Sequence, residues 1–280
     1  MGAVGIVLAG GRSSRMGAPK AHLEWHGVTL LRRTVGIVGR AVEGDVVVVR
    51  APGQDLPDLP DDVEVVDDDQ EGLGPMQGLA VGLRHMADRA ALAFLCSTDL
   101  PFLHPNYVRR VLAGFDDDTD AVVPRARGHR QPLAAGYRTT LAPTVERLLA
   151  DGARKPAMVL DACRTRWLSD EELLADPALA ATDPELTSVR NINTPEEYDA
   201  ALAEPLPQVT VERFGTLARD GGRGECQVAA ATLGATADAV GITLDRHVVA
   251  ALNGERITRD PATPLVAGDR IAFLSADAGG

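Results

Sequence analysis

The chain has 280 residues, of which 45% are hydrophobic and 24% are charged, and its formal net charge is −12. This length suffices for two domains, because single hydrophobic cores rarely grow beyond about 250–300 residues. The acidic balance argues against non-specific binding of nucleic acid, which depends on Lys and Arg neutralising phosphates. No apolar run reaches the ~18 residues of a membrane span and no secretory leader pattern opens the chain, so we expect a cytoplasmic protein without membrane contact.

The reactive residue types are sparse. The three cysteines, Cys96, Cys163 and Cys226, lie far apart without metal-ligand spacing, so we expect neither a disulfide framework nor a zinc site. Lys20 and Lys155 are the two lysines among 28 basic residues. A lysine next to a glycine-rich loop therefore stands out.

The first part of the chain alternates between strand and helix patterns. The apolar run from Gly2 to Ala9 breaks at Gly10 and Gly11, which predicts a buried strand that enters a loop. Further strands are expected at Asp45–Arg50, Val63–Val66, Ala91–Cys96 and Ala121–Pro124, and helices at Thr29–Val42, Met76–Met86 and Asn106–Phe115. This alternation predicts a three-layer α/β domain.

The rest of the chain predicts a boundary and a second, smaller domain. Residues 165–188 are acidic and rich in alanine, and we expect them to form surface structure without chemistry. A helix should end with Tyr198–Leu202, and a proline-containing linker should follow it. Beyond the linker, strands are expected at Val209–Phe214, His247–Leu252 and Arg270–Leu274, with a helix at Thr232–Val240. We therefore expect domains at residues 1–203 and 209–280, joined by the linker 204–208.

The segment from Leu8 to Lys20, LAGGRSSRMGAPK, places a glycine turn at the carboxyl end of the first strand, where open α/β sheets bind ligands. Glycines let backbone amides approach phosphates closely, while Arg15 and Lys20 supply positive charge. The spacing fits neither a P-loop nor the GxGxxG fingerprint. An unusual phosphate-binding loop is expected here.

This string resembles the LAGGxSxRMGxxK signature of nucleotidyltransferases that activate sugars and cofactors, and it is most similar to that of molybdenum cofactor guanylyltransferases. The resemblance covers about Val4 to Leu202. Three later segments resemble family motifs: Gly74–Leu79 its GPLAG turn with Met76-Gln77 replacing Leu-Ala, Ser97–Pro101 its CDTP or CDMP segment, and Asn191–Glu197 its NINTPED-like ending. Gln131-Pro132-Leu133 is similar to the acceptor-side HPL element, but glutamine replaces histidine, which leaves that contact open.

The resemblance implies a Rossmann-like nucleotidyltransferase domain that transfers GMP from GTP to molybdopterin or molybdenum cofactor and releases pyrophosphate. The implied nucleotide-binding residues are Leu8, Ala9, Gly10, Gly11, Lys20, Asp68 and Asp99, and the implied catalytic residues are Arg15, Lys20 and Asp99. It assigns Mg²⁺ to Asp99, in accord with the preference of magnesium for one or two carboxylates beside substrate phosphates. Asp68 matches the guanine- or ribose-contacting aspartate best, with Asp67 as second candidate. We expect Asn191 and Asn193 to cap the helix that begins near Pro195, rather than to contact acceptor or metal.

The C-terminal part resembles the ubiquitin-like β-grasp sulfur carriers, especially the small subunit of molybdopterin synthase. The matching residues are Leu252-Asn253-Gly254-Glu255, Leu265, Gly268-Asp269, Ile271, Phe273 and Gly279-Gly280. The resemblance implies a small α+β domain whose terminal carboxylate is adenylated and converted to a thiocarboxylate. It implies two partners, an adenylating or sulfur-transfer enzyme and the large subunit of molybdopterin synthase. Two glycines carry no side chains that could obstruct a narrow channel.

Two alternatives remain. A cytidylyltransferase, or another NTP transferase with a related phosphorylated acceptor, would share the fold and the metal site. A chain that acts chiefly as a sulfur carrier would keep an inactive transferase domain, but Lys20 and Asp99 argue against such a loss.

Overall fold

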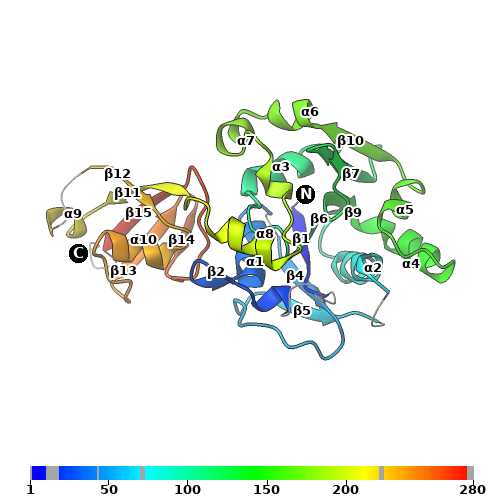
Figure 1. The fold of residues 1–280 in the computed structure, drawn as a ribbon, viewed down its shortest axis with the longest axis horizontal. Helices are drawn as coiled ribbons and strands as arrows, with labels where there is room; N and C mark the ends of the chain where they lie inside the picture. The colour runs from blue at the N-terminus through cyan, green and yellow to red at the C-terminus, as the bar shows by residue number, and fades with distance from the viewer. Residues whose placement is uncertain (1, 11–18, 43, 70–72, 221–223, 276–280) are drawn as a thin grey trace. The chain divides into compact units, whose positions relative to one another are not determined.

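The computed structural model describes residues 2–10, 19–42, 44–69, 73–220 and 224–275. The chain divides into two compact units, one made of residues 1–23 and 29–198 and the other of residues 24–28 and 199–280. Each unit contains its own large sheet, and Figure 1 labels the elements. Within these described ranges, no helix is long and apolar enough to cross a membrane.

The first unit is built on a mixed sheet with the strand order β10-β7-β9-β6-β1-β4-β5, in which β8 also pairs with β7. The strands are β1 (Ala3–Leu8), β4 (Val46–Arg50), β5 (Glu64–Asp67), β6 (Leu92–Ser97), β7 (Ala121–Ala126), β8 (His129–Arg130), β9 (Ala134–Arg138) and β10 (Thr165–Ser169). Strand β1 is parallel to β4 and β6, and β4 is parallel to β5. Strand β9 runs antiparallel to both β6 and β7, so β7 and its parallel neighbour β10 point the same way as β6. The carboxyl ends of all these strands except β8 and β9 therefore meet along one side of the sheet, which we call the carboxyl edge, opposite the amino edge.

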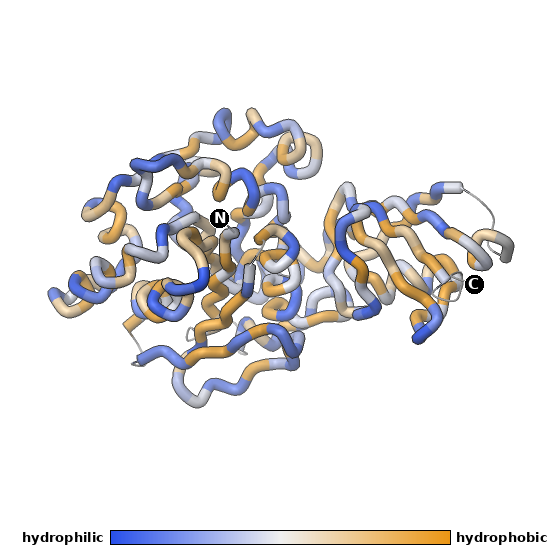
Figure 2. The backbone as a smooth tube through the Cα atoms, turned by 180° about the vertical axis from the view of Figure 1, so that it is seen from behind, coloured by the Kyte–Doolittle hydropathy of each residue, from blue (hydrophilic) through white to orange (hydrophobic). Residues whose placement is uncertain are grey.

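Helices cover both faces of this sheet. They are α1 (Leu30–Gly39), α2 (Pro75–Met86), α3 (Pro105–Leu112), α4 (Ala142–Ala150), α5 (Ala157–Leu160), α6 (Asp170–Leu174) and α7 (Pro177–Thr182), with 3-10 turns at Lys20–His22, Thr139–Leu141 and Thr187–Val189. Helix α8 (Pro195–Leu202) begins in the first unit and ends in the second. Neighbouring residues of β1 face opposite layers, since a Cβ on Gly5 would lie 2.4 Å from Val38 of α1, whereas Ile6 faces α2. Helix α2 packs closely on β1 at Gly82, where a Cβ would lie only 2.5 Å from the Ile6 side chain. In Figure 2 the central strands of this unit are coloured mainly as hydrophobic, in line with their burial.

The predicted α/β architecture of the first unit is confirmed, but residues 165–188 were assigned wrongly in part. Thr165–Ser169 forms β10 of the main sheet, and the side chains of Leu168, Leu173 and Leu179 are fully buried. As an edge strand, β10 has paired backbone on one side only, and its apolar residues are limited to Trp167 and Leu168, so it lacks the long apolar run by which the inner strands are recognised. The antiparallel strand β9 was also missed. Its Gly136 lies where a Cβ would come within 2.6 Å of Phe115, so close packing there selects glycine over a typical strand residue.

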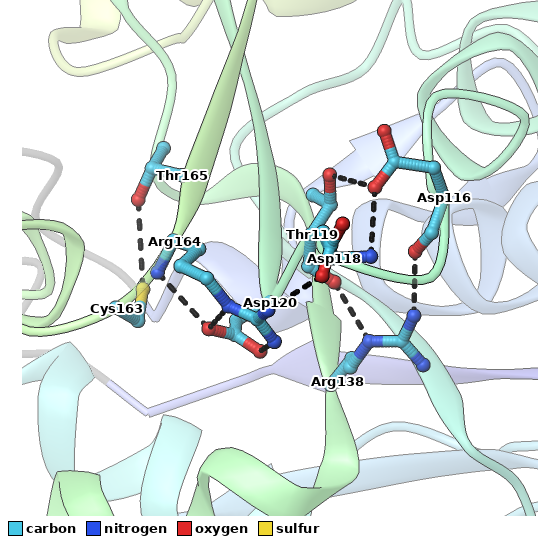
Figure 3. A network of polar contacts seen from close by, with 8 residues as sticks. All are labelled: Asp116, Asp118, Thr119, Asp120, Arg138, Cys163, Arg164 and Thr165. Carbon is cyan, nitrogen blue, oxygen red and sulfur yellow. Dashed lines mark hydrogen bonds and ion pairs between the residues drawn. The ribbon is translucent and has the colours of Figure 1, made fainter.

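A polar network at the amino edge joins the starts of β7 and β10 to the end of β9 (Figure 3). The Arg164 guanidinium donates to both carboxylate oxygens of Asp120 at 3.0 Å. The Arg138 guanidinium donates to the backbone carbonyls of Thr119 at 2.7 Å and of Asp116 at 2.6 Å. Each of these guanidiniums is bonded to oxygen atoms of neighbouring strand ends, so we assign the network to holding the strands together.

The second unit contains a five-stranded sheet with the order β12-β11-β15-β13-β14. The strands are β11 (Gln208–Arg213), β12 (Cys226–Ala229), β13 (Val248–Leu252), β14 (Arg256–Thr258) and β15 (Arg270–Ser275), with helices α9 (Leu217–Asp220) and α10 (Leu233–Ala239) and the separate hairpin of β2 (Glu24–Trp25) and β3 (Val28–Thr29). Strands β11 and β15 are parallel, and the other neighbours are antiparallel. Leu233 and Ala237 of α10 pack in one core with Val209 and Phe273 of the sheet. The three strands and the helix expected here are present, whereas β12 and β14 were not predicted.

Candidate active site

The structure describes the glycine-rich loop at its beginning, up to Gly10, and at its end, from Pro19. Leu8 ends β1 and is buried, and Gly10 is exposed beyond it at the carboxyl edge. Gly11 and Arg15, predicted for nucleotide binding and catalysis, lie outside the described residues, so their roles stay predictions.

The backbone at the beginning of the loop is fixed on two sides. The amide of Ala9 donates to the carbonyl of Val49 at 2.9 Å, and the Gln54 side chain donates to the carbonyl of Ala9 at 3.0 Å. The sequence analysis did not identify Gln54, because it lies in an irregular segment after β4 and belongs to no motif. Its amide nevertheless holds the chain where the loop leaves the sheet.

Lys20 lies between two oxygen acceptors that come from distant parts of the sequence. Its Nζ is 3.2 Å from Oδ2 of Asp99, with which it forms an ion pair, and it donates to Oδ1 of Asn193 at 3.1 Å. The Lys20 and Asp99 side chains are 19% and 17% exposed, so water screens their charges less than it would at an open surface. The structure thus brings together two of the predicted site residues and adds Asn193.

The turn that carries Asp99 is held from several directions. The Ser97 hydroxyl donates to Oδ1 of Asp99, and the amide of Ile192 donates to the Asp99 carbonyl at 3.0 Å. Buried Arg33 of α1 donates through Nε to the carbonyl of Pro101 at 2.7 Å. These bonds fix the Asp99 carboxylate and place the segment that contains Asn193 beside it.

The expectation that Asn193 caps α8 is wrong. The cap is Thr194, whose hydroxyl accepts from the amide of Glu197 at 3.2 Å, while the Glu197 carboxylate accepts from the Asn193 amide at 2.7 Å. The Asn193 side chain is therefore available to Lys20. Asn191 does not cap the helix either, since it is exposed and its side chain makes no hydrogen bond within the described part of the chain. Several capping residues in succession before a proline could not be told apart from sequence.

Three consecutive aspartates follow β5, and they differ in their bonding. Asp67 pairs with Nε of Arg50 at 2.6 Å, and Asp69 pairs with Arg84 at 3.0 Å. Asp68 between them has a buried oxygen, Oδ1, without a hydrogen-bond partner among the described residues. Of the three, Asp68 is thus the one whose carboxylate is left to accept bonds from a ligand.

The position of Asp68 agrees with this distinction. Its Oδ2 lies 3.9 Å from where a Cβ on Gly10 would be, and its Oδ1 lies 3.7 Å from the corresponding point at Gly78. The carboxyl group therefore lies between the beginning of the glycine-rich loop and the first turn of α2. Burial, and then the charges of Asp69 and Asp67, raise the pKa of Asp68 to about 6.

The oxygen atoms of the site fit a magnesium ion that is shared with a substrate. Within the described residues, no group of three or more His, Cys, Asp and Glu side chains could hold a metal. Magnesium needs fewer protein ligands, because one or two carboxylates commonly bind it together with phosphates and water. Asp99 and Asn193 present a carboxylate and an amide oxygen around the positive charge of Lys20. Such a pair suits a metal that arrives with the nucleotide.

Gln131, in the segment compared with the acceptor-side element, has a structural role. Its Nε2 donates to the carbonyl of Ala126 at 3.3 Å, and its amide donates to the carbonyl of Pro124 at 2.9 Å. Both bonds close the hairpin of β7 and β8.

Comparisons with known proteins agree with the fold of the first unit. A family model described as MobA-like NTP transferase domain matches residues 5–166. A probable molybdenum cofactor guanylyltransferase from Mycobacterium tuberculosis is 41% identical over 162 residues, which are 56% of this chain and 79% of the relative. A protein of the same name from Bacillus cytotoxicus is 29% identical over 200 residues, or 71% of this chain and 95% of the relative. The crystal structure of molybdopterin-guanine dinucleotide biosynthesis protein A from Archaeoglobus fulgidus matches 71% of this chain and 96% of its own with a TM-score of 0.55, and at 24% identity it shows the fold alone.

Proposed function

Because the chain belongs to the family of MobA-like NTP transferases and is thus a nucleotidyltransferase, we propose that it transfers GMP from GTP to molybdopterin or molybdenum cofactor. The observation that carries this proposal is the meeting of Lys20, Asp99 and Asn193 at the carboxyl edge, beside the glycine-rich loop. An ammonium group that donates to fixed oxygen acceptors is suited to a triphosphate and its counter-ion. The names of the related proteins support the same substrates.

In the proposed reaction, a phosphate oxygen of the acceptor attacks the α-phosphorus of GTP, and the bond to the leaving pyrophosphate breaks. This chemistry depends on alignment and charge neutralisation, so it requires no side-chain nucleophile. Lys20 turns from Asp99 to the triphosphate and stabilises the charge that develops there. Magnesium, when bound, neutralises further phosphate charge, and Asp99 together with Asn193 would hold it. Arg15 is proposed to help seat the triphosphate.

Asp68 supports guanine as the base. Its unpaired carboxylate lies near Gly10, and a carboxylate can accept from the N1 and N2 donors of guanine or from a ribose hydroxyl. Cytosine offers only its exocyclic amino group as a donor, so it would satisfy fewer of these acceptors. We therefore propose GTP over CTP, with the backbone of Leu8–Gly11 reading the base edge.

The test supplies each of the four NTPs with Mg²⁺ and molybdopterin and measures pyrophosphate release. GTP should support turnover at least tenfold better than CTP, and Asp68→Asn should reduce that preference. Equal or greater release with CTP would assign the chain to the cytidylyltransferases. If no nucleotide led to release of pyrophosphate, the alternative of a sulfur carrier with an inactive transferase domain would be favoured.

We propose a second role, as a sulfur carrier, for the β-grasp domain predicted at residues 209–280. It is supported by two turns that carry the resemblance and that contact each other in the second unit. Nδ2 of Asn253 donates to Asp269 at 2.9 Å, and the Asn253 side chain accepts from the amide of Arg270 at 2.8 Å. Asn253 has a φ of 55°, a conformation that asparagine tolerates better than most residues. Gly279 and Gly280 lie outside the described residues.

Mass spectrometry tests the second role. The protein is incubated with an adenylating enzyme, ATP and a sulfur donor, and the C-terminal peptide should gain about 16 Da as one oxygen of an activated carboxylate is exchanged for sulfur. Deletion of Gly279 and Gly280 should abolish this gain and leave guanylyl transfer nearly intact. A full-length chain that never acquires sulfur would refute the carrier role.

A further inference from the structure

Three side chains at the carboxyl edge converge outside the site of Lys20 and Asp99. The guanidinium carbon of Arg125 in β7 lies 4.4 Å from the ring centroid of Trp167 in β10, and that of Arg130 in β8 lies 4.9 Å from it. The half-buried Trp167 ring also packs against the hydrophobic core beneath it, which fixes its position. We call these three residues the Arg–Trp–Arg platform.

The two arginines of the platform are exposed, and no described residue supplies them with a counter-ion. No carboxylate of the described residues lies within ion-pair distance of Arg125 or Arg130, although the chain has a net charge of −12. A guanidinium that stacks on a ring uses its face and keeps the N–H donors at its rim available for oxygen atoms. The platform thus offers donors for an anion beside an aromatic surface.

The hairpin that carries both arginines is held firmly. Arg125 and Arg130 are register partners across β7 and β8, and the Gln131 side chain closes the hairpin backbone. At its tip, the amide of Arg127 donates to Asp170 at the start of α6 at 3.1 Å. The positions of the two guanidiniums are therefore set before any ligand binds, which lowers the entropic cost of binding.

The strand order places the platform on the other side of Asp99 from the proposed nucleotide site. The residues assigned to the nucleotide lie on or after β1, β5 and β6, whereas β7 and β10 lie beyond β9 on the far side of β6. Strand β7 is two positions from β6, or about 10 Å at the usual strand spacing. That separation suits a second small substrate whose reacting phosphate reaches the α-phosphorus near Asp99.

We propose that the Arg–Trp–Arg platform binds the acceptor of the transfer reaction, a planar ring system with a phosphate monoester. This inference rests on the proposed function, since it assigns a site to the second substrate of that reaction. The guanidinium rims donate to oxygen atoms of the acceptor's ring system and the exposed part of the indole contacts that ring, while the phosphate monoester extends toward Asp99.

Steady-state kinetics test the platform. Arg125→Gln and Arg130→Gln should each raise the KM for molybdopterin roughly tenfold, the usual effect of one charge-assisted hydrogen bond, while kcat and the KM for GTP stay within about twofold. Arg147→Gln on α4 is the matched control, because it removes the same charge from an exposed arginine outside the platform. An unchanged KM for molybdopterin, or an equal rise in the KM for GTP, would overturn the assignment.

A binding experiment separates this inference from the proposed function. Molybdopterin is titrated calorimetrically into the protein without nucleotide, and the Arg125→Gln/Arg130→Gln double variant should bind it at least tenfold more weakly than wild type. Trp167→Leu should weaken binding, and Trp167→Phe should restore part of it. If wild type binds molybdopterin and the double variant binds equally well, the platform is refuted whatever the transfer assay shows. If binding of molybdopterin depends on the platform but no NTP yields pyrophosphate, the proposed transfer reaction is refuted and the assignment of the platform as a binding site stands.

Discussion

At the amino edge of the large sheet, Arg164 and Arg138 are bonded to oxygen atoms of neighbouring strand ends (Figure 3), whereas Arg125 and Arg130 at the carboxyl edge stack on Trp167 and have no carboxylate partner in the described part of the chain. Both sets come from β7 to β10, so the same strands carry paired charge at one end and unpaired charge at the other. Asp68 adds to the carboxyl edge a buried oxygen, Oδ1, for which the described residues offer no partner.

This difference distinguishes a structural edge from a binding edge. A buried or half-buried polar group costs free energy unless it finds a partner, so partners within the fold indicate a role in stability. Groups left without partners beside a shared edge can be satisfied by substrates. Changes at Arg125 and Arg130 should therefore alter kinetics, and changes at Arg138 and Arg164 should alter stability.

The largest expected effect separates two aspartates of opposite edges. Asp99→Asn should lower kcat/KM for GTP by roughly 100-fold or more at limiting Mg²⁺ with little change in Tm, because it removes the charge proposed to hold the metal and its phosphates. Asp118→Asn is the control, since that side chain is 94% exposed and pairs with Arg164 at the amino edge. Pyrophosphate release and thermal unfolding measure both. An Asp99→Asn enzyme within threefold of wild type would place the metal elsewhere.

The two lysines give the next largest contrast. Lys20→Ala should reduce kcat roughly 10- to 100-fold, because a positive charge that stabilises the developing charge of the triphosphate is lost. Lys155→Ala, the other lysine of the chain, should leave kcat unchanged. If Lys20→Ala kept wild-type kinetics, the ion pair between Lys20 and Asp99 would have a structural role and no role in catalysis.

How much the sequence could predict depended on how local the signal was. The parallel strands and their helices follow from apolar runs and glycine turns, and Lys20 and Asp99 follow from motifs that lie beside those strands. The bond from Gln54 to Ala9 and the pairing of Asn193 with Lys20 join distant segments, so no spacing in the sequence indicates them. The structure was also needed to distinguish Asp68 from Asp67 and Asp69, because the partners of Asp67 and Asp69 come from β4 and α2, which are distant in the sequence.

Arg138→Ala should show the reverse of the changes at the carboxyl edge. It leaves the carbonyls of Thr119 and Asp116 without their donor, which should destabilise the fold by about 1–2 kcal/mol and lower Tm by about 3–6 °C. The KM values for GTP and molybdopterin should not change. Arg125→Ala is the matched comparison, with an unchanged Tm and a raised KM for molybdopterin. A changed KM in Arg138→Ala would show that the two edges are coupled.

The smallest effect concerns the pH dependence of stability at Asp68. Because the folded pKa of about 6 lies above the usual 3.8, the folded state favours the protonated carboxyl group. Its ionisation therefore costs stability as pH rises from about 4 to 6, and the full cost remains at higher pH. Asp68→Asn should raise Tm at pH 7.5 by roughly 2 °C, a modest value because solvent screens this half-exposed group, and should leave Tm nearly unchanged at pH 4.

Asp67→Asn is the control for that measurement, since Asp67 pairs with Arg50 at 2.6 Å and its substitution removes a favourable contact at pH 7.5. The two variants should thus shift Tm in opposite directions at pH 7.5, although each removes one negative charge from the same turn. If both raised Tm equally, relief of repulsion among the three aspartates would explain the result, and Asp68 would not be distinguished by its missing partner. If Asp68→Asn lowered Tm at pH 7.5 in the absence of nucleotide, the carboxylate would already be satisfied within the protein. At a saturating concentration of GTP, the Tm of wild type should exceed that of Asp68→Asn. GTP should stabilise wild type more, because only the carboxylate accepts from the nucleotide at two oxygens.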